Sequence, residues 1–203
     1  MTVISKRVFR PMGGKAGLAH ERIKRLAGVI TRAGARVRVA SVIWGDGARD
    51  IHIYASFANM EAAGKAAAAM NADPDFAAQR NESEADPASY SEGPEMWRTV
   101  FGEPQPTFPV ILQREYTIDR RRLASAVALL PEVQALRSDR PVIGVVPVLS
   151  GDMARIMIGY YAKSLADLGE SIDSVGMSEA FQAIMLRAAE FGSLTKARAI
   201  VNT

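Results

Sequence analysis

Four side chains on two consecutive segments are placed to share one binding site. Residues 37–44 and 50–57 alternate in polarity on either side of Gly45-Asp46-Gly47, a pattern that predicts two strands joined by a hairpin turn. Successive side chains of a strand point to opposite faces of the sheet. The apolar face of the second strand would therefore meet helices, and the other face of the hairpin would carry Arg38, Trp44, His52 and Tyr54.

These residue types can bind and transform a small molecule. Arg38 could hold an anion or an oxyanion, Trp44 and Tyr54 could contact an aromatic or apolar group, and His52 could act as a general acid or base near neutral pH. An unpaired arginine in a dry core would cost several kcal/mol, so this face is expected to be wet or to hold a ligand. Two plainer interpretations stay open: the face is a solvent-exposed edge, and His52 is only a hydrogen-bonded spectator.

The second half of the chain repeats the first. Gly45-Asp46-Gly47-Ala48-Arg49 matches Gly151-Asp152-Met153-Ala154-Arg155, with an offset of 106 before the turn and 105 after it. We therefore expect the second hairpin to have lost one residue. The matching face would carry mostly small or apolar residues and one further candidate for ligand binding, Tyr161; its expected members are Gly144, Val146, Val148, Ser150, Met157, Gly159 and Tyr161.

Each half predicts the order strand, helix, strand, strand, helix, strand. Gly34 would end the first helix, Asn59 and Ser164 would cap equivalent helices, and Asp73-Pro74 would start a short one. This order is the ferredoxin-like split motif. We expect an α+β protein with a ferredoxin-like repeat at 1–103, a Pro-rich linker at 104–109 and a second repeat at 110–203. Since helices cover one face of each sheet, the two antiparallel sheets should pack together as an intrachain α/β barrel.

With this element order, two segments resemble the dimeric α/β-barrel superfamily as a fused tandem pair. They are Asn59-Met60-Glu61-Ala62-Ala63-Gly64 with Phe76, and Ser164-Leu165-Ala166-Asp167-Leu168-Gly169 with Phe181. The superfamily includes NIPSNAP-like and antibiotic-biosynthesis-monooxygenase-like proteins. The resemblance implies the fold and a site between the sheets. Some of its monooxygenases use Asn, Trp and His without a cofactor; Trp44 and His52 are present here, but Asn59 is better explained as a helix cap.

Composition excludes several classes of function. The chain has no cysteine, so disulfides and thiolate metal sites are ruled out, and two distant histidines give no support to a metal site. A net charge of +3 without a basic face disfavours nucleic acid, and Arg120-Arg121-Arg122 fits a solvated helix end. No apolar stretch is long enough to cross a membrane. We expect a cytoplasmic protein without a bound cofactor; haem, which some relatives bind, would need His52.

The leading functional hypothesis is a small-molecule-binding protein with its site between the two sheets. The alternative is a cofactor-independent enzyme (monooxygenase, cyclase or isomerase) acting on a hydrophobic molecule, with His52 as acid or base. A structural or partner-binding module is the third option. The polar stretch 82–95 could be a lid or a surface insertion. A homodimer through the outer helices or a free sheet edge is favoured narrowly over a monomer.

Overall fold

The first half of the chain forms four strands and three helices in the expected order. A computed structural model describes all residues from Met1 to Thr203. The elements of this half are β1 (Val3–Pro11), α1 (Ala16–Arg32), β2 (Arg36–Gly45), β3 (Ile51–Phe57), α2 (Met60–Ala72), α3 (Pro74–Ala85) and β4 (Ser89–Phe101). The predicted helix ends are confirmed: Asn59 accepts a hydrogen bond from the Ala62 N–H, Asp73 from the Asp75 N–H, and Gly34 has φ 101° just beyond α1.

The second half repeats this order with shorter helices. Its elements are β5 (Val110–Ile118), α4 (Leu123–Val127), α5 (Leu130–Leu136), β6 (Val142–Leu149), β7 (Arg155–Ala162), α6 (Leu165–Ser171), α7 (Glu179–Ala189) and β8 (Gly192–Asn202). The side chain of Ser164 accepts a hydrogen bond from the Asp167 N–H and so caps α6, as Asn59 caps α2. Pro131 lies in the first turn of α5, where its missing N–H costs nothing. None of the helices is both long and apolar enough to cross a bilayer.

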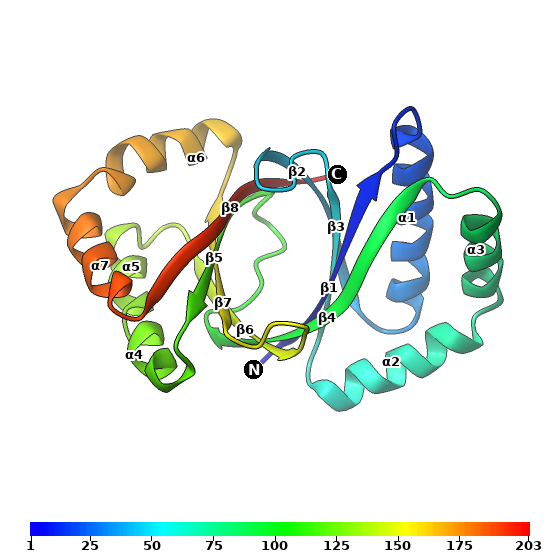
Figure 1. Ribbon diagram of the computed structural model, residues 1–203, viewed down its shortest axis with the longest axis horizontal. Coiled ribbons are helices and arrows are strands. Elements are labelled where there is room, and N and C mark those ends of the chain that lie inside the picture. Colours follow the sequence, from blue (N-terminus) through cyan, green and yellow to red (C-terminus); the bar gives the residue numbers. More distant parts are fainter.

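All eight strands belong to one closed antiparallel barrel, in the order β1-β3-β2-β8-β5-β7-β6-β4. The two-sheet α/β barrel predicted from the sequence is confirmed, and the edges of its two sheets are joined: β2 pairs with β8, and β4 pairs with β6. Figure 1 shows the barrel in the middle, with α1, α2 and α3 outside one wall and α4 to α7 outside the opposite wall. A closed barrel has no free sheet edge, so the version of the homodimer prediction that used one is wrong.

Because side chains alternate between the two faces of each strand, the barrel has an outer core under the helices and an inner core inside it. Ile51, Ile53, Ala55 and Phe57 pack against the helices of the first half, as predicted. The inner core fills the middle of the barrel and includes Tyr54, Trp97, Met157, Tyr161 and Ile200. The barrel interior is therefore packed along part of its length, and open space is confined to its ends.

One expectation about the elements needs correction. Residues 82–95 are not a loop, because α3 continues to Ala85 and β4 begins at Ser89 and pairs with β1. This rules out a lid there. That the two halves are separate domains divided at 104–109 stays a prediction.

Candidate functional site

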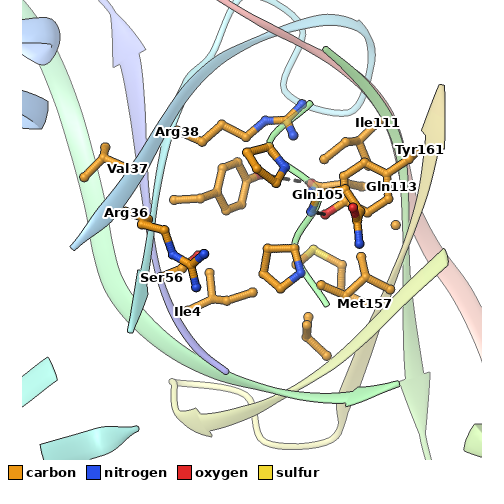
Figure 2. Close-up of a pocket in the computed structure, with 16 residues that line it drawn as sticks. Ile4, Arg36, Val37, Arg38, Ser56, Gln105, Ile111, Gln113, Met157 and Tyr161 are labelled. Carbon is orange, nitrogen blue, oxygen red and sulfur yellow. Dashed lines mark hydrogen bonds between the residues drawn. The ribbon is translucent and has the colours of Figure 1, made fainter. Parts of the chain in front are cut away.

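A cavity of about 110 Å³ lies inside one end of the barrel. We name it the Arg38 cavity. One water needs roughly 10–15 Å³, so the space suits a small organic molecule. Its walls come from both halves of the chain and from the linker, and Figure 2 shows Arg36 and Arg38 on one side of it and Gln113 and Tyr161 on the other. The lining residues are Ile4, Arg36, Val37, Arg38, Tyr54, Ser56, Pro104, Gln105, Pro106, Ile111, Gln113, Ile143, Val145, Met157, Gly159 and Tyr161.

Two arginines of β2 give this cavity a positive charge that nothing on its walls cancels. Arg36 is exposed and Arg38 half-buried, two residues apart on the same face of the strand. No aspartate or glutamate lines the cavity, and neither arginine is within ion-pair distance of a carboxylate. The Arg38 guanidinium donates one hydrogen bond, from Nη2 to the Pro109 carbonyl at 3.2 Å, and its buried Nε–H has no partner. Burial lowers the pKa of Arg38 from its usual value.

Tyr54 lines the cavity, and its hydroxyl lies within hydrogen-bond distance of His52. The His52 Nδ1 lies 2.7 Å from the Tyr54 hydroxyl, which in turn donates to Gln113 Oε1 at 3.1 Å. In that arrangement His52 Nδ1 carries the proton and donates to Tyr54. Burial, followed by the charges of Lys6 and Arg198, lowers the pKa of His52 to about 2. Burial raises the pKa of Tyr54 to about 12. Both side chains are therefore neutral at pH 7.

The Pro-rich linker forms the roof of the cavity. Pro104, Gln105 and Pro106 line it, and the Gln105 N–H donates to the Tyr161 hydroxyl at 3.1 Å. The ring of Phe108 packs against that of Tyr161 with centroids 5.9 Å apart. The sequence of this stretch predicted only a boundary between the two repeats. Its role as a wall of the cavity depends on the contact between Gln105 and the distant Tyr161, which no local sequence pattern predicts.

The structure brings together three of the four candidate ligand-binding residues. Arg38, Tyr54 and Tyr161 all line the cavity. Trp44 does not: it is 55% exposed, so its assignment to the site is wrong. The register between β2 and β8 shifts between Val42 and Trp44, and this bulge breaks the alternation that would have turned Trp44 inward. His52 is completely buried behind Tyr54 and lines no part of the cavity, so it positions Tyr54; a catalytic role for it stays a prediction.

The prediction of which β6 residues face inward is also wrong, because the inward positions are displaced by one residue. Arg38 pairs with Tyr54 in the first hairpin, and Ile143 pairs with Gly159 in the second. The offset between the halves is thus 105 on both strands, and no residue is lost from the second hairpin; the Gly-Asp dipeptide is merely shifted within the turn. Ile143 and Val145 face the cavity, whereas a Cβ on Gly144 would lie 2.6 Å from Leu130 on the helix side.

Two polar lining residues were missed from the sequence, although strand alternation contains the signal for both. Arg36 shares the inward face of β2 with Arg38, and Gln113 shares that of β5 with Ile111. Both would follow from extending the alternation by two residues. Gln105 has no such signal, because it lies in the linker.

Haem does not fit this barrel. His52 is the only histidine inside it, its Nδ1 is engaged by Tyr54, and its Nε2 is enclosed by protein without facing an open space. The cavity of about 110 Å³ is far smaller than a porphyrin. No group of three or more ligating side chains is arranged to hold a metal ion.

Comparisons with solved structures agree on the architecture. An anthrone oxidase-like protein matches with a TM-score of 0.66 at 11% identity, covering 100% of this chain and 91% of that one. A "putative monooxygenase" of Lactobacillus acidophilus gives 0.63 at 12% identity, with 100% and 94% coverage. A chlorite dismutase of Candidatus Nitrospira defluvii gives 0.54 at 10% identity, with 98% and 90% coverage.

The fold is that of the dimeric α/β barrel. The resemblance drawn from the sequence is thereby confirmed at the level of architecture. No family model matches the chain, and no curated protein sequence does. At 12% identity or less the structural likenesses show the fold alone, so the chemistry must be argued from this chain's own side chains.

Proposed function

We propose that this protein binds a small, largely apolar molecule carrying one carboxylate, and that it does so in the Arg38 cavity. The observation that carries the proposal is the pair of arginines, Arg36 and Arg38, at a mostly apolar cavity whose walls hold no carboxylate. A buried guanidinium normally has an anionic partner. Here the missing partner is supplied by the ligand.

The cavity offers different contacts to the two ends of such a ligand. Its carboxylate would accept hydrogen bonds from the free Nε–H of Arg38 and from Arg36 at the mouth. Charge-assisted bonds of this kind are worth about 1.5–3 kcal/mol each. The apolar body would contact the side chains of Ile111, Ile143 and Met157. This combination of apolar walls and a few polar groups is the usual makeup of a ligand site.

Binding is proposed here in preference to acid–base catalysis. A general acid or base at neutral pH needs a pKa near 7. The pKa of His52 is lowered to about 2 and that of Tyr54 is raised to about 12, both mainly by burial. The one hydroxyl proton of Tyr54 is already donated to Gln113, and His52 donates to the same hydroxyl, so these contacts fix Tyr54 as a neutral wall of the cavity.

The proposal is tested by titrating the protein with matched pairs of acids and amides. Benzoate and hexanoate are the probes, and benzamide and hexanamide are their uncharged counterparts. We expect calorimetry to show each acid binding at least tenfold more tightly than its amide, and Arg38→Met to remove most of that preference. One charge-assisted hydrogen bond corresponds to roughly a factor of ten or more in affinity.

Two variants control for indirect effects. Arg120→Met removes the same charge from an exposed position in the turn before α4, and Trp44→Ala removes a large side chain from β2 outside the cavity. Both should keep the wild-type preference. Equal affinity for acids and amides, or loss of the preference in Arg120→Met as well, would contradict the proposal.

A further inference from the structure

The opposite end of the barrel holds a second, larger cavity of quite different character. Its volume is about 210 Å³, and we name it the Lys6 chamber. Val8 is its one hydrophobic lining residue. It lies at the far ends of the strands that line the Arg38 cavity: Lys6 and Glu115 lie further along β1 and β5 than Ile4 and Ile111 do. Walls this polar suit a polar ligand rather than an apolar one.

Every carboxylate of the chamber already has an arginine partner. Arg155 contacts Glu95 and Glu115 at 2.6 and 2.9 Å, and Arg198 contacts Asp46 and Glu115 at 3.2 and 3.4 Å. Arg10 lies 3.6 Å from Asp50 and 3.7 Å from Glu92. Each carboxylate thus has an arginine within ion-pair distance, but five carboxylates face three arginines, so charge balance also requires the two lysines that line the chamber.

Lys6 and Lys196 line the chamber without an ion pair; Lys196 is exposed, and Lys6 is the buried one. Its side chain lines the chamber from β1 and is only 5% exposed, yet no carboxylate lies within ion-pair distance of its amine and no hydrogen bond engages it. Glu95 is its direct neighbour on β4 and its Oε1 is taken by Ser150 and Arg155, whereas its Oε2 has no hydrogen bond. A buried amine without an ion pair, in a polar space that also holds a carboxylate with one free oxygen, is the arrangement of a lysine that reacts with carbonyl groups.

We propose that Lys6 is the nucleophilic amine of a second site, where it condenses with a small aldehyde or keto acid to form a Schiff base. The amine nitrogen forms a bond to the carbonyl carbon, and the carbonyl oxygen then leaves as water together with the two amine protons. Glu95 accepts a proton from the attacking nitrogen and returns it to the departing oxygen. No oxidant, reductant or metal is needed. The site is independent of the carboxylate site at the other end of the barrel.

The electrostatic surroundings keep part of the amine neutral. Burial lowers the pKa of Lys6 to about 8, with Arg198 and Arg155 lowering it further and Glu115 and Glu95 opposing them. Lys196 on β8 and the ion-paired Arg10, Asp46, Asp50 and Glu92 also line the chamber. His52, on the neighbouring strand, is neutral at this pH because its pKa is about 2. With that pKa about a tenth of the Lys6 amines are unprotonated at pH 7, some hundredfold more than for an ordinary lysine.

Reductive trapping tests the proposal on the intact wild-type protein. The probes are glyoxylate and propanal with sodium cyanoborohydride, and peptide mass spectrometry follows each of the six lysines separately. We expect Lys6 to be labelled at least tenfold faster than the exposed Lys24 at pH 7, with a rate midpoint near pH 8. The N-terminal amine is the internal reference. Labelling of Lys6 no faster than Lys24, while the N-terminus reacts, would overturn the proposal.

Two variants separate nucleophile from proton carrier. Lys6→Met should abolish the fast adduct and leave the labelling of Lys24 unchanged. Glu95→Gln should slow adduct formation severalfold without raising the rate midpoint of Lys6, whereas Glu92→Gln, on the same strand at the rim, should not slow it. A Glu95→Gln rate equal to wild type would overturn the assignment of Glu95.

Discussion

The two ends of the barrel differ in whether their charged side chains are paired with opposite charges. At the Arg38 cavity, two arginines face a space of about 110 Å³ with no carboxylate on its walls. At the Lys6 chamber, of about 210 Å³, five carboxylates face three arginines and two lysines, and neither lysine forms an ion pair. One site has a surplus of positive charge that calls for an anion. The other has equal numbers of acidic and basic side chains, and one of its two unpaired amines, that of Lys6, is buried, which favours covalent chemistry.

A packed middle layer makes this contrast possible by separating the two ends. Trp97, Ile200 and His52 are completely buried there, and the Arg155 guanidinium of the chamber lies 5.0 Å from the Trp97 ring. Trp97→Ala should cost about 3–5 kcal/mol of unfolding free energy, as measured by urea denaturation, because it opens a large hole in a closed core. A loss below about 1 kcal/mol would show that the ends are not separated by close packing.

His52 should make the unfolding free energy of the protein depend on pH, and its lowered pKa fixes the direction of that dependence. Its folded pKa is lowered to about 2, whereas an unfolded histidine titrates near 6.5, so only the unfolded state takes up a proton as the pH falls through 6.5. The unfolding free energy should therefore fall by about 2 kcal/mol between pH 6.5 and 5. His52→Gln should remove this slope.

His20 provides the matched control for that measurement. It is the only other histidine and lies on α1, outside the barrel. His20→Gln should keep the wild-type slope between pH 6.5 and 5. A slope that survives in His52→Gln, or vanishes in His20→Gln, would contradict the burial of a neutral histidine between the two ends.

Lys6 should make the unfolding free energy depend on pH above pH 8, with a smaller effect than that of His52. Its folded pKa is lowered to about 8 against about 10.5 unfolded, so the unfolded state binds more protons between these values. Stability should rise by about 1–2 kcal/mol from pH 8 to 9.5. Lys6→Met should be at least as stable as wild type at pH 7 and should lack this rise. A flat wild-type profile would mean that the chamber solvates the amine fully.

Much of the fold was predictable because the two halves of the chain carry matching sequence signals. The repeated Gly-Asp turn, the caps Asn59 and Ser164, and the alternation of Ile51 and Ile53 with His52 and Tyr54 each indicate the same elements independently. Agreement among local signals of this kind is what allows a sequence to specify one structure. Arg38 and Tyr54 could be assigned to the interior on alternation alone.

The rest of the site depends on contacts between distant segments. Trp44 points outward because of a bulge opposite β8, which follows it by more than 140 residues, and Ile143 replaces Gly144 on the inner face because strand pairing, not turn sequence, sets the register. The roof formed by Gln105 requires the hydroxyl of Tyr161. Lys6 could not be singled out, since its isolation depends on which carboxylates the arginines take.

The carboxylate site is tested most directly at the Nε–H of Arg38, the one guanidinium nitrogen at that cavity that is buried without a partner. Its ¹⁵N and ¹H resonances, assigned by their absence in Arg38→Lys, can be followed by NMR as benzoate is added. We predict a downfield proton shift and slowed exchange with water that saturate together with binding, and no such change with benzamide. Benzoate binding that leaves the Arg38 Nε–H resonance unmoved would contradict the account.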